Sequence, residues 1–323
     1  MKTRKDKETN EFLDPEDWKR FINYISDNNR FILSEYWEKF VNTIVNTAHK
    51  RTKTLKKNKM LFRARLGTCW EQVDDDGNYD HCPIPPDKMG SPPINEATAG
   101  RLNPERIPYL YLASTIDTAV AEVRPWIDSD ITIGYFKIAS DLKILDTSHD
   151  KASDSPSLTE WIFDEDDESF IGVRKRPIHS FTPTEKEKYI WGGINTTFSR
   201  PISPNDSPLK YLPTQFLSEK LKAEGYDGIV YKSSLNEDGH NIALFDSQKA
   251  KCIMCRMYGI KKVTYGYEEL GNPTFLSNDG ENLRNRIVDI EPLNEDNREK
   301  QGADGEKSHI KANSVDAKSS ATD

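Results

Sequence analysis

The stretch YLYLASTIDTAVAEVRP, from Tyr109 to Pro125, combines a strand pattern with a short helix pattern. YLYLA alternates aromatic and aliphatic residues, which is typical of a strand. Ser114 or Thr115 can cap the helix that follows, and Pro125 ends it. Near the end of this helix stands Glu122, where the helix dipole mildly disfavours a carboxylate. The segment predicts a strand–helix unit and raises the question of what Glu122 does.

Outward from this stretch, the middle of the chain reads mainly as strands. The expected strands are MLFRARLG from Met60, ITIGYFKI from Ile131, LKILD from Leu142, DGIVYKSS from Asp227, NIALFD from Asn241 and KCIMCRMYGI from Lys251. PTQFLSEKLKAEG is a helix pattern that ends at Gly225, a residue favoured just past a helix C-terminus. Because strands dominate and few helices alternate with them, we predict a mixed, β-rich α+β fold.

Residues 1–59 read as an N-terminal helical region followed by a basic linker. Its two apolar stripes at helical spacing are Trp18, Phe21, Ile22 and Ile25, then Trp37, Phe40, Val41, Ile44 and Ala48. The run KRTKTLKKNK at 50–59 lacks the interleaved aromatic residues of a nucleic-acid contact, so we read it as a solvated connection. The helical hairpin can pack on the main domain, on a regulator, or on a second copy as a homodimer. The sequence leaves these alternatives open.

The main domain is expected at 60–270, interrupted by two long insertions. One is a Pro/Gly/Asp-rich loop at about 74–100, and the other is an irregular segment at about 151–208. The acidic run Asp164–Glu168 within the second insertion reads as a solvated loop. Residues 280–323 are too polar to bury enough apolar surface to fold, so we expect a disordered tail there.

Charge and composition narrow the class of protein. The formal net charge of −8 disfavours broad electrostatic binding to nucleic acid or to an anionic membrane. No apolar run approaches the roughly 20 residues of a membrane-spanning helix, and the N-terminus is charged rather than signal-like. Four cysteines are too few for a disulfide-framed secreted domain of this size. We therefore expect a cytoplasmic protein without a membrane partner.

Several familiar catalytic sites are missing from the sequence. No Gly-rich loop of phosphate-binding or dinucleotide-binding spacing follows a strand, and no serine stands in a Gly-x-Ser-x-Gly elbow. Cys69, Cys82, Cys252 and Cys255 can supply four thiolates for zinc. However, Cys252 and Cys255 lie in an apolar stretch, where cysteine behaves as a core residue. We therefore assign no metal site.

A set of polar residues remains in or beside the apolar strands of the main domain. Arginines that are buried in strands need anionic partners. Two arginines, an aromatic ring, a carboxylate and a hydroxyl suit a ligand with phosphates, a flat ring and a sugar that develops positive charge. The residues are Arg63, Arg65, Arg101, Tyr111, Glu122, Ser233 and Ser234. The alternative for Glu122 is an exposed last-turn glutamate, or one paired with Arg124.

The order of these motifs resembles the RES-domain family, which is named for its arginine, glutamate and serine. The matching pieces are FRAR at 62–65, GRLN at 100–103, YLYLASTIDTAVAEV at 109–123, YLPTQFLSEKLKAEGYDGIVYKSS at 211–234 and NIALFD at 241–246. The resemblance covers roughly residues 61–246, and its specificity comes from the succession of the pieces rather than from any one of them. The long insertions, the added termini and Lys232, where compact members often carry proline, depart from the family pattern.

The resemblance implies an ADP-ribosyltransferase-like fold and an enzyme that consumes NAD+. Such enzymes cleave the N-glycosidic bond to nicotinamide by hydrolysis or, with inorganic phosphate as co-substrate, by phosphorolysis, and they need no further cofactor. Many family members are toxins of toxin–antitoxin pairs, so a growth-arresting toxin or defence effector with an antitoxin or regulatory partner is expected. An ADP-ribosyltransferase that modifies a macromolecule, and a non-enzymatic NAD-binding module, are the alternatives.

Carried over position by position, the resemblance implies three catalytic residues, Arg63, Glu122 and Ser233. It further implies substrate-binding residues at Arg101, Tyr111, Arg65, Ser234 and Asn241. Arg65 competes with Arg63 for the role of the family arginine, because both stand on the same face of one strand. Ser234 likewise competes with Ser233.

Overall fold

The computed structural model describes residues 11–28, 30–72, 74–148, 181–200, 208–267, 275–276 and 282–283. The chain divides into two units, Met1–Val263 and Thr264–Asp323. In the second unit, β11 (Phe275–Leu276) and β12 (Asn282–Leu283) pair antiparallel. The tail expected at 280–323, apart from Asn282–Leu283, and the acidic run Asp164–Glu168 lie outside the described residues.

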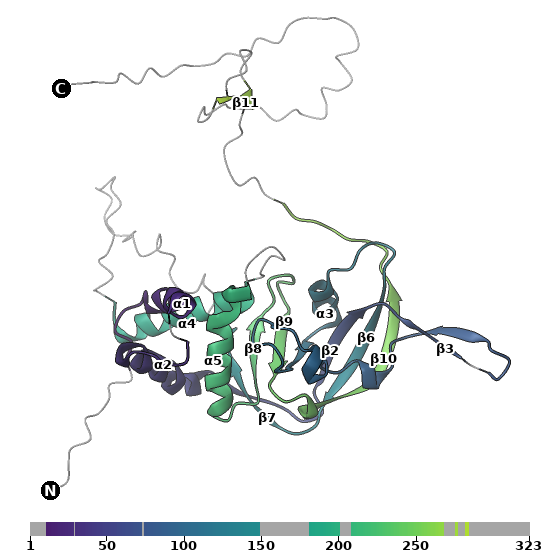
Figure 1. Cartoon of the computed structure of the whole chain (residues 1–323), viewed down its shortest axis with the longest axis horizontal. Coiled ribbons are helices and arrows are strands. Elements are labelled where there is room, and N and C mark those ends of the chain that lie inside the picture. The colour runs from purple at the N-terminus through teal and green to yellow at the C-terminus, as the bar shows by residue number, and fades with distance from the viewer. Residues whose placement is uncertain are drawn as a thin grey trace, which may run out of the picture. The chain divides into compact units, whose positions relative to one another are not determined.

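Eight strands of the first unit form one mixed sheet (Figure 1). They are β1 (Thr52–Leu55), β2 (Met60–Leu66), β5 (Leu110–Ala113), β6 (Asp130–Ile138), β7 (Leu142–Asp146), β8 (Gly228–Lys232), β9 (His240–Leu244) and β10 (Ala250–Gly259). Their order across the sheet is β1-β7-β8-β9-β5-β2-β6-β10. Every neighbouring pair is antiparallel except β7–β8, which is parallel. A mixed sheet with segregated helices confirms the predicted α+β class.

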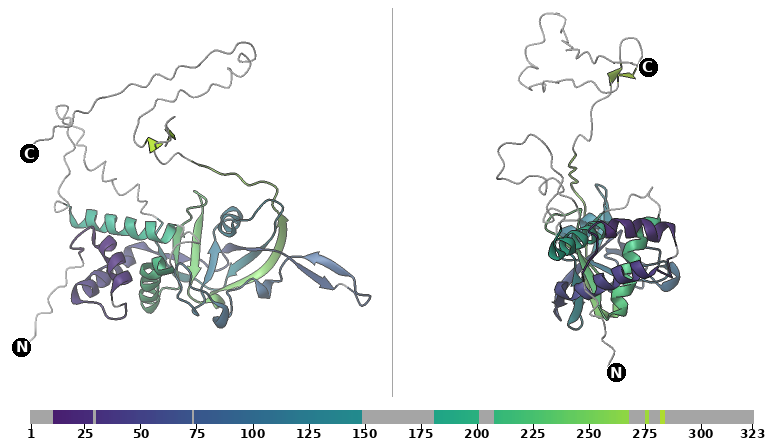
Figure 2. Two further views of the ribbon diagram at one scale, coloured as in Figure 1. Left: turned by 45° about the horizontal axis from the view of Figure 1, so that its top comes forward. Right: turned by 90° about the vertical axis from the view of Figure 1, so that its left-hand side faces the viewer.

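The α-helices of the described part of this unit are α1 (Asp17–Asp27), α2 (Glu35–Ala48), α3 (Ile116–Val123), α4 (Pro183–Ser199) and α5 (Leu212–Ala223). Short 3₁₀ turns are η1 (His49–Arg51), η2 (Pro86–Lys88), η3 (Ile94–Glu96), η6 (Pro208–Tyr211) and η7 (Ser247–Lys249). Four of the α-helices gather at the β7–β8 end of the sheet, whereas α3 lies apart from them beside β2 (Figures 1 and 2). None of the described helices has the length and the apolar run that a bilayer crossing requires.

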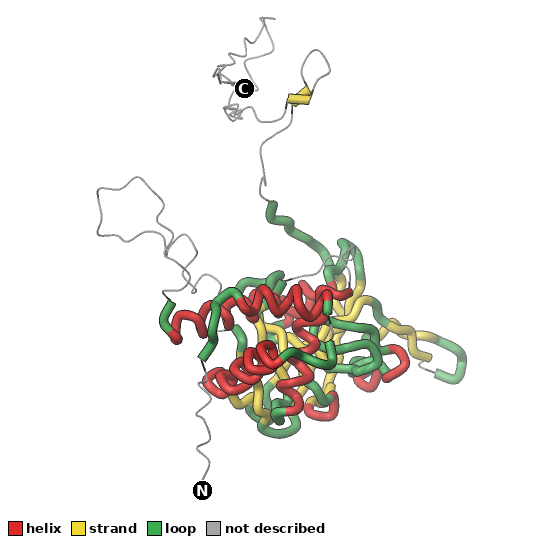
Figure 3. Tube along the Cα trace, turned by 60° about the vertical axis from the view of Figure 1, so that its left-hand side comes forward, coloured by secondary structure: helices red, strands yellow, loops and turns green. Residues whose placement is uncertain are grey.

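The two faces of the central strands are buried in different clusters, because side chains alternate along a strand. Ile229 and Ala243 pack with α1, α2, α4 and α5, which lie over one face (Figure 3). Their neighbours Val230 and Ile242 face a second cluster with Leu110 and Phe136. The face that carries the helices is also the face on which Tyr231 and Asn241 lie.

The apolar stripes of α1 and α2 pack inside the first unit. Trp18, Phe21 and Ile44 belong to the cluster that contains α4 and α5. The indole Nε1 of Trp18 donates a hydrogen bond to Thr197 Oγ1 at 3.0 Å. A Cβ atom at Gly193 would lie only 2.9 Å from Trp18 Cδ1, so the indole occupies the space that glycine leaves. The sequence left open whether the helical hairpin packs on the main domain, on a regulator or on a second copy. In the structure, it packs on the main domain.

Three segments are more regular than the sequence analysis expected. Strand β1 lies within the basic run 50–59 and pairs antiparallel with β7 at the edge of the sheet. Lysines are common on edge strands, because they discourage pairing with other molecules. Within and beside the loop expected at 74–100, β3 (Cys69–Gln72) and β4 (Tyr79–Cys82) form a separate two-stranded sheet. The Asp74 carboxylate accepts hydrogen bonds from the backbone N–H of Asp76 and Asn78, which makes the turn between them compact.

The third segment is α4, which lies within the insertion expected to be irregular at 151–208. Its N-terminus is a capping box: Thr182 Oγ1 accepts from Glu185 N–H, and Glu185 Oε2 accepts from Thr182 N–H. The pair Gly192–Gly193 lowers the helix propensity of this segment. Packing against Trp18 overrides that propensity.

Candidate active site

A cleft of about 290 Å³ opens where the sheet ladder is weakest. Strands β2 and β5 share a single register pair, Phe62 and Ala113, and α3 lies beside this gap. The polar residues that line the cleft are Arg63, Arg101, Tyr111, Glu122, Tyr231 and Asn241. They come from β2, the loop before β5, β5 itself, α3, β8 and β9. The structure thus brings together five of the residues singled out in the sequence, with Tyr231 added.

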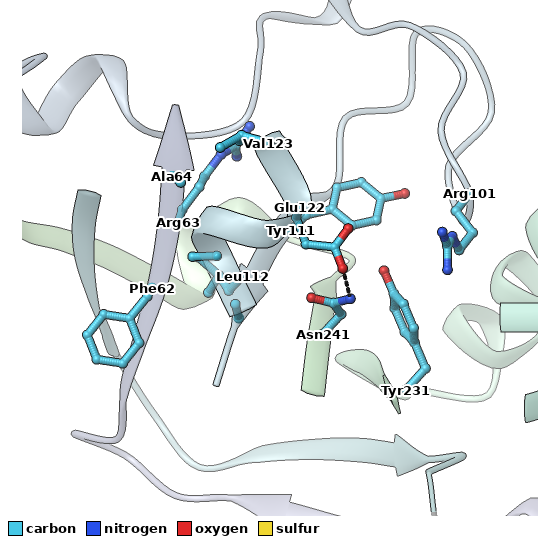
Figure 4. A pocket seen from close by; sticks show the side chains of 12 residues that line it. Phe62, Arg63, Ala64, Arg101, Tyr111, Leu112, Glu122, Val123, Tyr231 and Asn241 are labelled. Atoms are coloured by element: carbon cyan, nitrogen blue, oxygen red, sulfur yellow. Dashed lines mark hydrogen bonds between the residues drawn. The ribbon is translucent and has the colours of Figure 1, made fainter. Parts of the chain in front are cut away.

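Glu122 is the carboxylate of this cleft, and one of its oxygens is held by Ser233, just after β8, and by Asn241 on β9. Its Oε1 accepts a hydrogen bond from Asn241 Nδ2 at 2.6 Å and another from Ser233 Oγ at 3.0 Å. Ser233 and Asn241 are 3% and 6% exposed, whereas Glu122 reaches solvent. Figure 4 shows Glu122 between Tyr111 and Asn241. Buried donors therefore fix the orientation of a carboxylate that stays accessible.

Helix α3 is fixed in position by its own cap and by the β8–β9 turn. Thr115 Oγ1 accepts from the backbone N–H of Thr118 at 3.1 Å, which makes Thr115 the N-cap. Thr118 Oγ1 in turn accepts from Asn236 Nδ2 in the turn. A Cβ atom at Gly239 would lie 2.0 Å from Thr118 Oγ1, so only glycine permits this approach. The same turn joins the strands of Ser233 and Asn241, which keeps Glu122 in register with its donors.

The loop that carries Arg101 is organised by Tyr111. Tyr111 Oη donates to Asn103 Oδ1 at 2.7 Å and accepts from the backbone N–H of Leu102 at 3.0 Å. Burial is the main cause that raises the pKa of Tyr111 above its ordinary value. A Cβ atom at Gly100 would lie 2.3 Å from Asn103 Oδ1 and 3.0 Å from Tyr111 Oη. Packing therefore requires glycine at position 100, and the hydroxyl of Tyr111 stabilises the loop that carries Arg101 by hydrogen bonding to it.

Arg101 is further restrained from the helical layer. Its Nη1 donates to the carbonyl of Phe198 near the end of α4, and its own carbonyl accepts from Thr214 Oγ1. Gln215 Nε2 donates to the carbonyl of Gly100 at 2.8 Å. The guanidinium carbon lies 5.4 Å from the centroid of the Tyr231 ring. These contacts present the cation to the cleft in a defined orientation.

Arg63 differs from Arg101 in having an unsatisfied nitrogen. Its Nη1 is buried, and no hydrogen-bond partner lies within reach among the described residues. Desolvation by burial is the main cause, and the charge of Arg65 the next, that lowers the pKa of Arg63 to about 10. Arg63 therefore stays protonated at neutral pH. A buried cationic donor without a partner costs free energy, which an anionic ligand would recover.

Arg65 and Ser234, the alternatives to Arg63 and Ser233, do not line the cleft. Arg65 is exposed, does not line the cleft, and donates through Nη1 to the carbonyl of Lys88. Ser234 is also exposed, whereas Ser233 is buried against Glu122. Arg63 therefore lines the cleft and Ser233 contacts the carboxylate, whereas Arg65 and Ser234 do neither.

Sequence reasoning missed two contributors to the site. Tyr231 is 4% exposed, lines the cleft and stands two residues before Ser233 on β8, so strand alternation could have placed it on the same face. Burial is the main cause that raises its pKa. The carbonyl of Phe198 could not have been found, because α4 itself was not expected.

The cleft suits an anion better than a metal ion. The Glu122 carboxylate already accepts two hydrogen bonds, and two arginines line the same cleft (Figure 4). Among the described residues, the group of three potential metal ligands that lie close together is Cys69, Glu71 and Cys82, none of which lines the cleft.

The chain is similar to known proteins in two respects. A family model described as the RES domain matches residues 84–265, more than half of the 323 residues. The matched range includes Arg101, Tyr111, Glu122 and Ser233 and begins after Arg63. The crystal structure of the M. tuberculosis MbcT–MbcA toxin–antitoxin complex contains a chain with 12% identity and a TM-score of 0.36; the alignment covers 67% of this chain and 92% of that one. No curated protein sequence matches significantly.

Proposed function

Because the chain belongs to the RES domain family, we propose that it consumes NAD+ by cleaving the glycosidic bond between ribose and nicotinamide. The observation that carries this proposal is the Glu122 carboxylate, held at one oxygen by Ser233 and Asn241 in a cleft with two arginines. A nicotinamide ribosyl bond breaks through a transition state that resembles an oxocarbenium ion. A preorganised carboxylate stabilises such developing positive charge.

In this mechanism the bond between ribose C1 and the pyridine nitrogen breaks, and its electron pair leaves with neutral nicotinamide. A water or phosphate oxygen then forms the new bond to C1. Glu122 stabilises the cationic ribose, or hydrogen-bonds its hydroxyl and positions the nucleophile. Ser233 and Asn241 hold the carboxylate during this step. With water as nucleophile, the product is ADP-ribose and one proton is released.

The anionic part of the substrate is assigned to the arginines. The fork of donors on a guanidinium suits phosphate oxygens, so Arg63 and Arg101 bind the pyrophosphate. The buried Nη1 of Arg63 gains an acceptor that no described residue supplies. Tyr111 offers its ring to the nicotinamide side while its hydroxyl holds the loop. At the level of the cell, we propose that NAD+ depletion by this chain arrests growth, which an antitoxin would prevent.

The test is to incubate the purified protein with NAD+, with and without inorganic phosphate, and to identify the products. Nicotinamide with ADP-ribose indicates hydrolysis, and a phosphorylated ADP-ribose formed only with phosphate indicates phosphorolysis. Radiolabel that is transferred from NAD+ to protein would instead support an ADP-ribosyltransferase. Binding of NAD+ without any product would identify a binding module and refute the enzymatic proposal.

The matched variants are Glu122→Gln and Asp117→Asn, which each neutralise one carboxylate of α3. We expect kcat of Glu122→Gln to fall by about 10³, because the transition-state charge loses its partner. Asp117 is exposed in the first turn and lines no part of the cleft, so its variant should stay near wild type. Both variants should keep the wild-type circular dichroism spectrum. Normal turnover by Glu122→Gln would remove Glu122 from the mechanism.

A further inference from the structure

The β3–β4 hairpin brings two thiols and two carboxylates onto one face. Cys69 and Cys82 are direct register partners, with their Sγ atoms 3.1 Å apart. Two pairs further along, Glu71 stands opposite Asp80. Side chains two residues apart share a strand face, so all four point to the same side of the hairpin. The ligand atoms of Cys69, Glu71 and Cys82 lie within 4.8 Å of one another.

We propose that this face of the hairpin binds a divalent transition metal ion of the Zn²⁺ type through Cys69, Cys82 and Glu71, with a water molecule in the fourth position. Zn²⁺ takes thiolate sulfur and carboxylate oxygen in tetrahedral sites, where two sulfurs stand about 3.7 Å apart. The observed sulfur separation therefore needs only a small widening by side-chain rotation. On binding, both thiols lose their protons to solvent, and two metal–sulfur bonds form.

The electrostatics of the hairpin favour a cation at this position. The carboxylates of Glu71 and Asp80 stand on the same face as the two thiols, so thiolates formed there would meet repulsion from converging negative charge. A divalent cation reverses that effect, since it stabilises the thiolates and carboxylates together.

A metal ion would also supply the stability that the hairpin lacks. Its two strands have four residues each and form a sheet separate from the main one, and the hairpin projects beyond β10 (Figure 1). A two-stranded hairpin alone is marginally stable in water. Cys69 is the first residue of β3 and Cys82 the last of β4, so the metal would clamp the base. On the opposite face, Trp70 stacks on His81 and is 66% exposed.

The second cysteine pair provides an internal control. Cys252 and Cys255 lie on β10 with their Sγ atoms 3.6 Å apart, and Cys252 is buried in the apolar cluster with Phe136. Among the described residues, this pair belongs to no group of three close metal-ligand atoms. The two pairs therefore share their thiol chemistry and differ in the carboxylates beside them.

The proposal is tested by titrating the reduced, metal-stripped full-length protein with Zn²⁺ against a chromophoric chelator, and with Co²⁺ while recording thiolate-to-cobalt absorption. We expect one equivalent to bind. Affinity should fall at least about 100-fold in Cys69→Ser and Cys82→Ser, and about tenfold in Glu71→Gln. Cys252→Ser and Cys255→Ser should stay within about twofold. Zn²⁺ should slow amide hydrogen exchange in β3 and β4 of the wild type but not of Cys69→Ser.

Three outcomes would overturn the proposal. The first is the absence of a bound equivalent, and the second is a loss of binding in Cys252→Ser that equals the loss in Cys69→Ser. The third is a disulfide between Cys69 and Cys82 that persists under the reducing conditions of the titration, seen as two rather than four free thiols. NAD+ consumption should be the same with and without bound Zn²⁺, which separates this site from the cleft.

Discussion

The two walls of the cleft differ in whether their charged side chains already have hydrogen-bond partners in the protein. On the α3–β9 wall, Glu122 is bound by Ser233 and Asn241, so the network is complete before any ligand arrives. On the β2 wall, the Nη1 of Arg63 is buried without a partner among the described residues. A complete hydrogen-bond network stabilises the fold and orients a reactive group. A buried donor without a partner instead gains its hydrogen bond only when a ligand binds, and this gain contributes to the affinity for the ligand. Substitutions on the two walls should therefore change stability in opposite directions.

After Glu122→Gln, the largest effect is expected from Arg63→Met. Removing the cation should lower kcat/KM for NAD+ by about 100-fold, because charge-assisted hydrogen bonds to the pyrophosphate are lost. The free energy of unfolding, measured in urea, should stay constant or rise, since the buried donor has no partner to lose among the described residues. A loss of stability above about 1 kcal/mol would mean that Arg63 is already satisfied in the free protein.

Next in size is Gly100→Ala, which probes the loop between the walls. The added Cβ would meet Asn103 Oδ1 and force the loop that carries Arg101 to move. A displacement near 1 Å can cost about 100-fold in rate, so we expect a ten- to roughly hundredfold loss of kcat/KM, with KM raised. Gly90→Ala is the matched control, because nothing lies within 4 Å of a Cβ there. Equal kinetics for the two variants would show that the loop adapts.

Asn241→Ala should have a smaller kinetic effect and a clear effect on stability. Glu122 would keep Ser233 but lose its shorter hydrogen bond, at 2.6 Å. We expect kcat to fall about tenfold and the free energy of unfolding to fall by about 1–2 kcal/mol, measured by urea denaturation. If Asn241→Ala and Arg63→Met shift stability in the same direction, the contrast between the walls fails.

The smallest effect is expected from Arg65→Gln. Arg65 is exposed and its hydrogen bond goes to the backbone of Lys88, outside the cleft. We predict kcat/KM within about twofold of wild type in the same NAD+ assay, as for most exposed positions away from a site. A drop as large as that of Arg63→Met would make Arg65 the substrate-binding arginine.

Much of this architecture followed from local pattern. The strand and helix around Glu122 were predicted because alternation, a threonine cap and a terminating proline all agree within seventeen residues, Tyr109–Pro125. The helix α5 was predicted for similar reasons, and Gly225 adopts the left-handed φ of +76° that the pattern implied. Such elements carry their own signals.

Other elements depend on contacts that a sequence does not display. In α4, Gly193 weakens the helix locally, and Trp18, 175 positions earlier, fills the space above it. The capping sequence at Thr182–Glu185 was the available signal. For the site, the resemblance assigned the catalytic role to Arg63 but left Arg65 as a competitor on the same strand face, and the tertiary structure separates the lining residue from the exposed one. The hydrogen bond from Arg101 to the carbonyl of Phe198 in α4 could likewise not be predicted from the sequence.

The close approach of Trp18 to Gly193 has a consequence for how this sequence can vary. A larger residue at position 193 would collide with the indole, and a smaller residue at position 18 would leave a void beside the glycine. We expect either change alone to lower stability, so the two positions should change together among relatives of this chain. A relative that keeps both tryptophan at position 18 and glycine at position 193 should therefore also keep its N-terminal helices packed on α4. A relative in which only one of the two residues has changed should have lost this packing.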